Sequence, residues 1–119
     1  MRVLIVDDSR TARMMLKKVL PPALGADVLE AADGGEAIRR VSSDRIDLMF
    51  LDLTMPEVDG YQVLKTLKDT GRTPPTIVVS ADVQPLAQQR VRDLGAMAFV
   101  RKSLSASDLR SVLQGAGLL

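Results

Sequence analysis

Five polar residues of this sequence follow short apolar runs directly or by one or two positions: Asp7, Asp8, Asp52, Ser80 and Lys102. A carboxylate can act as a nucleophile and form an acyl phosphate, while an ammonium and a hydroxyl that face it stabilise the transferred group. Three carboxylates in one cavity would repel one another, and Mg²⁺ best offsets such crowding because it accepts carboxylate, water and phosphate oxygens. Asp52 would be the nucleophile, provided that the fold brings the five residues together.

The apolar runs have the composition of short β-strands. Five such runs occur, at Val3 to Val6, Asp27 to Ala31, Leu48 to Leu51, Thr76 to Val79 and Ala98 to Val100. Continuous apolar runs of this length are typical of strands that are covered on both faces of a sheet. We therefore expect five strands.

Helical patterns separate these runs, at about Arg10 to Leu20, Gly35 to Val41, Tyr61 to Lys68, Pro85 to Leu94 and Ala106 to Leu113. Asp33 and Ser105 have the spacing to an acidic residue that is typical of a capping box, so each should begin a helix. Gly71 and Gly95 stand where helices should stop, and Pro21 should end the first helix early because it cannot donate a backbone hydrogen bond.

Strands that alternate with helices predict an α/β fold with right-handed crossovers. We expect a doubly wound, flavodoxin-like, five-stranded parallel sheet with strand order 2-1-3-4-5 and helices on both faces. Ligands bind such sheets beyond the carboxyl ends of the strands, near the point where the strand order reverses. The first and third strands flank that point, so Asp7, Asp8 and Asp52 should meet there.

Composition excludes several other classes of protein. The chain has 119 residues, which is the size of one domain, and we expect residues 1–119 to fold as a single unit. It has no cysteine and a formal net charge of +1, which argue for a reducing, cytoplasmic compartment and against direct nucleic-acid binding. No apolar run is long enough for membrane insertion or for a signal peptide. With no histidine in the chain, any phosphohistidine donor must be another molecule.

Several motifs make the chain resemble a response-regulator receiver domain over nearly its whole length, most closely the stand-alone chemotaxis (CheY-like) type. They are Val-Asp-Asp-Ser at 6–9, Leu-Asp-Leu-Thr-Met-Pro at 51–56, Asp-Gly at 59–60, Val-Ser-Ala at 79–81 and Phe-Val-Arg-Lys at 99–102. The resemblance implies a two-component signalling switch that accepts a phosphoryl group from a sensor histidine kinase. Such a switch catalyses only its own phosphorylation and dephosphorylation, and we expect a monomer.

The resemblance assigns roles to the acidic residues first. Asp52 matches the phosphoacceptor, and the Mg²⁺ ligands are matched by Asp8, Asp52 and the backbone carbonyl of Thr54. Asp7 matches a residue that assists the metal, often through water.

The resemblance also assigns the switching residues. Ser80 matches the hydroxyl that binds the phosphoryl group, Lys102 the ammonium that pairs with it, and Phe99 the aromatic residue that moves inward. Taken alone, Phe99 could equally be ordinary core. The implied binding face for a downstream target is the fourth helix, fifth strand and fifth helix, which carry Gln88, Arg92, Arg101 and Ser111.

Two residues depart from the family pattern. Ser103 stands where a proline usually follows the lysine, and Phe99 stands where tyrosine is common. The Lys102–Ser103 bond is then either a strained cis bond or a relaxed trans bond with a rerouted loop and a partly displaced lysine. A cis peptide bond before a residue other than proline costs about 2.5 to 4 kcal/mol, so we expect the trans bond.

Two other functions are compatible with parts of the sequence. A phosphatase of the haloacid dehalogenase type also uses an aspartate nucleophile and Mg²⁺, but it normally has a second aspartate two residues later, where this chain has Thr54. The length also leaves no room for a cap domain. The other alternative is an interaction module that keeps the fold and no longer depends on phosphorylation, for which Ser103 is the only indication.

Overall fold

The computed structural model describes residues 1–119 and contains one parallel sheet of five strands. The strands are β1 Arg2–Val6, β2 Asp27–Ala31, β3 Leu48–Leu51, β4 Thr76–Ser80 and β5 Ala98–Arg101. They are arranged in the order β2-β1-β3-β4-β5, as the sequence predicts. The strand order reverses at the β1/β3 pair, which is therefore the switch point of the sheet.

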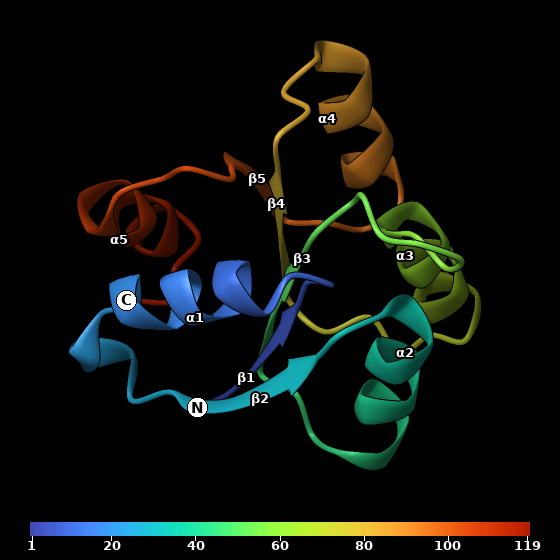
Figure 1. Ribbon diagram of the computed structural model, residues 1–119, viewed down its shortest axis with the longest axis horizontal. Helices are drawn as coiled ribbons and strands as arrows, with labels where there is room; N and C mark the ends of the chain where they lie inside the picture. The colour runs from blue at the N-terminus through green and yellow to red at the C-terminus, as the bar shows by residue number, and fades with distance from the viewer.

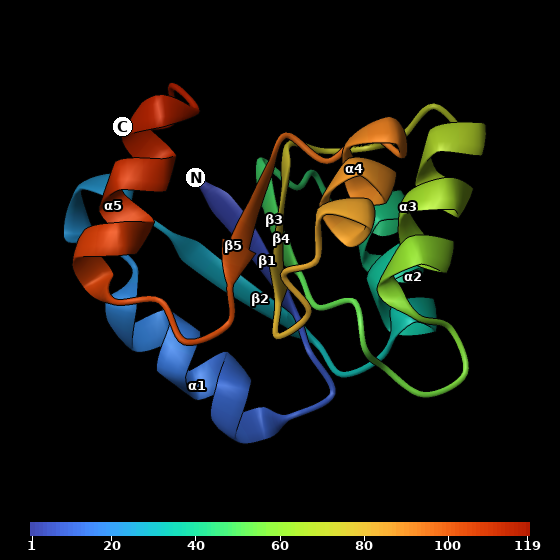
Figure 2. The same ribbon diagram turned by 90° about the horizontal axis from the view of Figure 1, so that it is seen from above.

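Five α-helices cover the two faces of this sheet. They are α1 Arg10–Val19, α2 Gly34–Ser43, α3 Gly60–Asp69, α4 Pro85–Asp93 and α5 Ala106–Gly115, with a short 3₁₀ helix at Pro22–Leu24. Figure 1 shows the chain winding from strand to helix, and Figure 2 shows α2, α3 and α4 on one face with α1 and α5 on the other. The doubly wound architecture is thus confirmed. None of the helices combines the length and the apolar character that crossing a membrane requires.

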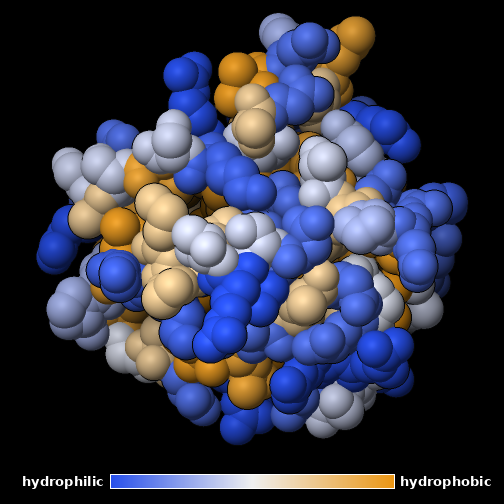
Figure 3. Space-filling view, in the orientation of Figure 1, coloured by the Kyte–Doolittle hydropathy of each residue, from blue (hydrophilic) through white to orange (hydrophobic).

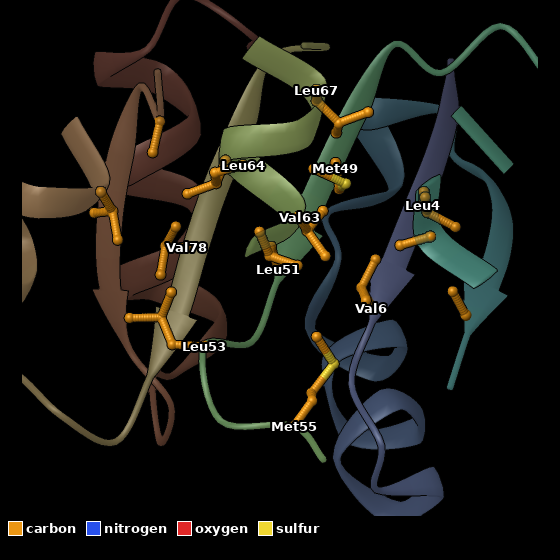
Figure 4. Close-up of a cluster of buried hydrophobic side chains, with 14 of the residues drawn as sticks. Leu4, Val6, Met49, Leu51, Leu53, Met55, Val63, Leu64, Leu67 and Val78 are labelled. Carbon is orange, nitrogen blue, oxygen red and sulfur yellow. The ribbon is translucent and has the colours of Figure 1, made fainter. Parts of the chain in front are cut away.

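The central strands are apolar throughout because their side chains alternate between two cores. Leu4 and Val6 of β1 belong to a core under α2, α3 and α4, whereas Val3 and Ile5 belong to a core under α1 and α5. Figure 4 shows the first of these cores, in which Val63, Leu64 and Leu67 of α3 lie against the sheet. Each residue of β3 is buried, so the end of this strand is rigidly placed.

Most of the helix boundaries follow the local signals in the sequence. The capping box at Ser105 is complete, but Asp33 makes only the half in which its side chain accepts from the Glu36 amide. A further complete capping box at Asp59 begins α3. The first helix ends at Val19, before Pro21, as expected.

Helix α1 packs more loosely than the other helices. None of its residues is buried, and the side chains of Met14 and Met15 are largely exposed. Leu16 and Val19 are the members of α1 that lie partly buried against the core. Apolar burial therefore contributes less to the position of α1 than to that of α3.

Candidate functional site

The carboxyl ends of β1 and β3 bring three acidic residues together. Asp7 and Asp8 follow β1, Asp52 follows β3, and one carboxylate oxygen from each lies within 4.8 Å of the others. Asp7 and Asp52 are buried, while Asp8 is exposed. The expected convergence of these three residues at the switch point is therefore confirmed.

Backbone hydrogen bonds continue the pairing of β3 with β1, and of β1 with β2, by one residue beyond the end of the strand, and so fix the backbones of the two buried aspartates. The Asp52 amide donates to the carbonyl of Val6 at 3.0 Å, and the Asp7 amide donates to the carbonyl of Ala31 at 3.1 Å. The amide of Ser9 donates to Asp7 Oδ1 at 2.9 Å. Sheet register, rather than loop conformation, thus determines where Asp7 and Asp52 lie.

Lys102 reaches this cluster from the end of β5. Its Nζ lies 3.0 Å from Asp7 Oδ2 and 3.4 Å from Asp52 Oδ2. The chain contains no cis peptide bond, so the trans Lys102–Ser103 bond is confirmed. The expected displacement of the lysine was wrong, since its Nζ reaches both carboxylates. The reason is that the Lys102 amide donates to the Ser80 carbonyl at 3.0 Å, which fixes the backbone of Lys102 whatever residue follows it.

The electrostatics of the cluster reflect burial and crowding. Burial raises the pKa of Asp52, the negative charge of Asp7 raises it further, and Lys102 and the Thr54 backbone only partly oppose them. Burial alone would lower the pKa of Lys102, but its hydrogen bond to Asp7 and the charge of Asp52 outweigh burial and raise the pKa. Asp52 Oδ2 is buried without a hydrogen-bond donor. The nearest cationic atom is the Lys102 ammonium at 3.4 Å, so this oxygen has an ion-pair partner but no hydrogen-bond donor.

The remaining residues expected at the site lie on adjacent elements. Ser80 ends β4 and is buried, and its Oγ accepts from the Asp82 amide at 3.1 Å. Thr54 is exposed in the loop between β3 and α3. Phe99 is half-buried on β5 and packs against the core under α2, α3 and α4, a position that suits ordinary core packing as well as a switch.

Gly60 belongs to a motif that the sequence interpretation quoted, but that interpretation gave this glycine no structural role. A Cβ atom at Gly60 would lie 2.5 Å from the carbonyl oxygen of Asp52 and 2.8 Å from the Cα of Leu53. The first turn of α3 therefore approaches the end of β3 closely, and the Gly60 amide donates to the Leu53 carbonyl at 3.1 Å. The Asp-Gly pair at 59–60 was the available signal, since glycine permits such approach of two backbones.

A cavity of about 430 Å³ opens beside the cluster, between α1 and the loop that joins β5 to α5. Asp7, Asp52 and Lys102 line its polar part, while Leu16, Phe50 and other apolar residues line the remainder. The oxygen-rich donor set of the cluster suits a hard divalent cation such as Mg²⁺.

Comparison with known proteins assigns the family. A model described as the response regulator receiver domain matches residues 3–114. The chain belongs to this family. Receiver domains are the phosphoacceptor switches of two-component signalling, bind Mg²⁺ through acidic residues, and act with histidine kinases and downstream effectors.

This receiver domain has similar relatives among curated proteins and solved structures. It is 34% identical over 115 residues to the two-component response regulator ORR41 of Oryza sativa subsp. japonica, covering 94% of this chain and 91% of that protein. It is 39% identical over 104 residues to the gliding motility regulatory protein of Myxococcus xanthus, covering 86% of this chain and 13% of that protein. The structure of a CheX-CheY-BeF3-Mg complex from Borrelia burgdorferi matches with a TM-score of 0.86 and 30% identity, over 96% of this chain and 87% of that chain.

The domain spans only part of several of these relatives. It corresponds to 9% of the length of the sensor protein EvgS of Escherichia coli O157:H7 and to 47% of the response regulator MprA of Mycobacterium avium. Receiver domains of this kind are thus found in proteins of very different length.

Proposed function

We propose that Asp52 of this receiver domain accepts a phosphoryl group from a partner sensor histidine kinase, and that its phosphorylation changes the binding of a downstream target. The observation that best supports this role is the buried Oδ2 of Asp52, which accepts no hydrogen bond and lies 3.4 Å from the ammonium of Lys102. A buried carboxylate oxygen without a hydrogen-bond donor is costly, so its retention favours a chemical role over a structural one.

The proposed reaction is an in-line displacement at phosphorus. A carboxylate oxygen of Asp52 forms a bond to phosphorus, the bond from phosphorus to the donor's leaving atom breaks, and the product is an aspartyl phosphate. The Lys102 ammonium lies 3.4 Å from Asp52 Oδ2 and 3.0 Å from Asp7 Oδ2. This places it close enough to pair with the oxygens of a phosphoryl group that arrives at Asp52. Ser80 would contribute a hydroxyl to the same oxygens.

The residues present fit a magnesium ion. Asp8, Asp52 and the backbone carbonyl of Thr54 would hold it, with Asp7 assisting. When bound, Mg²⁺ supplies positive charge that offsets the three carboxylates and the oxygens of the phosphoryl group. The exposed position of Asp8 suits a ligand on the solvent side of such an ion.

The proposed signal runs from Ser80 and Phe99 to the face formed by α4, β5 and α5. Arg92, Arg101 and Ser111 are exposed on these elements, whereas the half-buried Gln88 donates its side-chain amide to the Val83 carbonyl at 2.8 Å. Figure 3 shows apolar residues exposed at the top of the molecule, over α4. Val83, two residues before α4, and Leu86 in its first turn are exposed apolar side chains that would contact a target protein.

The proposal also covers the extent of the domain, its compartment, its oligomeric state and its catalytic activity. Residues 1–119 would act as one receiver unit in the cytoplasm, monomeric, without direct contact with nucleic acid. The domain would catalyse only its own phosphorylation and dephosphorylation. A phosphatase of the haloacid dehalogenase type is disfavoured because Thr54 occupies the position of the second aspartate.

Labelling of the pure protein tests this proposal against both alternatives. Intact mass spectrometry after incubation with acetyl phosphate should show one added phosphoryl group with Mg²⁺ and none with EDTA. No adduct in either buffer would favour an interaction module that does not depend on phosphorylation. Steady turnover of a phosphate ester would instead favour the phosphatase.

A further inference from the structure

Arg13 connects α1 to two strands through its guanidinium group. Its Nη1 donates to the backbone carbonyl of Asp7 at 2.6 Å, and its Nε donates to Glu30 Oε1 at 2.9 Å. The Arg13 side chain is only 13% exposed, although Glu30 is 38% exposed, and the two contacts hold the guanidinium between β2 and the end of β1. Arg13 touches none of the three carboxylates of the cluster.

The carbonyl that Arg13 binds belongs to the peptide unit that joins Asp7 to Asp8. A peptide unit is planar, so fixing its oxygen also fixes the amide and the Cα of the next residue. Asp7 has other restraints, because its side chain contacts Lys102 and the Ser9 amide. Asp8 is exposed, and its carboxylate lies within 4.8 Å of those of Asp7 and Asp52 without a hydrogen bond or ion pair to the protein. Its position therefore depends on this peptide plane.

Glu30 holds the guanidinium in place from β2. Lys17 contacts the other oxygen of this carboxylate at 3.3 Å, so two cations of α1 share one acidic partner. The hydrogen bond from Arg13 lowers the pKa of Glu30, which keeps the carboxylate ionised and paired. Because no residue of α1 is buried, these polar contacts help to fix the helix against the sheet.

We infer that Arg13 is a positioning residue for the metal site: it orients the Asp7–Asp8 peptide so that the Asp8 carboxylate is presented to Mg²⁺, and Glu30 orients Arg13. The inference rests on the proposed function, because it concerns the Mg²⁺ that supports phosphorylation of Asp52. Groups that orient metal ligands through one intervening contact commonly change metal affinity by about 10-fold to 100-fold when they are removed.

The test is the Mg²⁺ dependence of labelling by acetyl phosphate in Arg13→Gln. We expect the half-saturating Mg²⁺ concentration to rise about tenfold, with the rate at saturating Mg²⁺ within about twofold of the parent rate, because the nucleophile and Lys102 are untouched. Calorimetric titration with Mg²⁺ alone should give the same shift. Arg13→Lys, which keeps the charge but lacks the planar group that binds two acceptors, should raise the half-saturating concentration by a smaller factor.

Lys17→Gln is the matched control. This substitution removes a positive charge from the same helix, and that charge contacts the same carboxylate of Glu30. Lys17 does not contact the Asp7 carbonyl, so the Mg²⁺ dependence of labelling should equal that of the parent. Glu30→Gln should shift Mg²⁺ dependence in the same direction as Arg13→Gln. The double variant of Arg13 and Glu30 should be no worse than Arg13→Gln alone, because both substitutions act through one contact.

The outcomes separate this inference from the proposed function. A parent protein that neither binds Mg²⁺ nor becomes labelled would overturn both. A parent that does both, with unchanged Mg²⁺ dependence in Arg13→Gln, would overturn only the role of Arg13, even if the variant melts at a lower temperature. If Arg13→Gln fails to fold, unchanged Mg²⁺ dependence in Arg13→Lys and Glu30→Gln would overturn it equally.

Discussion

Replacing Lys102 by methionine removes the ammonium that lies between Asp7 and Asp52 while keeping a side chain of similar length. At 3.0 and 3.4 Å, each of the two ion pairs is worth about 5 kcal/mol of attraction at an effective dielectric constant of about 20. Desolvation offsets most of that attraction, and breaking a fully buried pair costs about 3–5 kcal/mol. The Lys102 side chain is 34% exposed, so we discount this value for solvent screening and expect a loss of about 1–2 kcal/mol.

The assay is urea and thermal unfolding of the parent and Lys102→Met, each in EDTA and in saturating Mg²⁺. In EDTA the variant should melt about 4–8 °C below the parent, from the entropy of unfolding typical of a domain of this size. In Mg²⁺ the difference should shrink to less than half, because the bound ion replaces the missing positive charge beside the same carboxylates.

Lys65→Met is the control for loss of an ordinary ion pair. Lys65 pairs with Asp69 at 3.1 Å on the surface of α3, where both side chains are more than half exposed. Its removal should cost about 0.5 kcal/mol or less in either buffer, as is typical of such pairs. An equal loss for Lys102→Met with and without Mg²⁺ would refute the reasoning, since the lysine would then stabilise the fold by packing instead of by balancing the acidic cluster.

Three further predictions concern the same edge of the sheet. Gly60→Ala should lower the free energy of unfolding in urea by about 1–3 kcal/mol, because the atoms that its Cβ would meet belong to backbone. Gly115→Ala in α5, with no atom within 4 Å of the added Cβ, should be neutral or stabilising, and equal losses would contradict this. Asp8→Ala should weaken Mg²⁺ binding in calorimetry yet be no less stable in EDTA, because it relieves repulsion; a marked loss there would mean that protein hydrogen bonds hold this carboxylate. Because burial and Asp7 raise the pKa of Asp52, the folded state keeps that proton to higher pH than the unfolded chain, so ionisation lowers stability as pH rises above 3.8. In EDTA, the parent should therefore lose stability relative to Asp52→Asn as the pH rises from about 4, and parallel pH profiles would argue against this shift.

The sequence predicts the fold well because a strand that is buried on both faces needs a continuous apolar run, and such runs are easy to recognise in a sequence. The β1 run alternates Leu4 and Val6 toward one core with Val3 and Ile5 toward the other, which requires an apolar residue at every position. The convergence of Asp7 and Asp52 then follows from parallel pairing alone, since each comes one residue after the end of its strand.

Contacts between distant side chains could not be predicted in the same way. The contact between Arg13 and Glu30 spans 17 residues and depends on how α1 crosses the sheet, which a loosely packed helix does not reveal in its apolar pattern. The position of Lys102 depends on a hydrogen bond from its amide to the Ser80 carbonyl, which the sequence alone does not reveal. The role of Gly60 likewise depends on the distance between two backbones.

Labelling of Asp52→Asn tests the central proposal most directly. Asparagine is nearly the same size as aspartate but cannot attack phosphorus, so the variant should keep the fold, as judged by circular dichroism. After incubation with acetyl phosphate and Mg²⁺, intact mass spectrometry should show one phosphoryl group on the parent and none on Asp52→Asn. A variant labelled to the same stoichiometry as the parent would show that the nucleophile lies elsewhere and would contradict the proposed site.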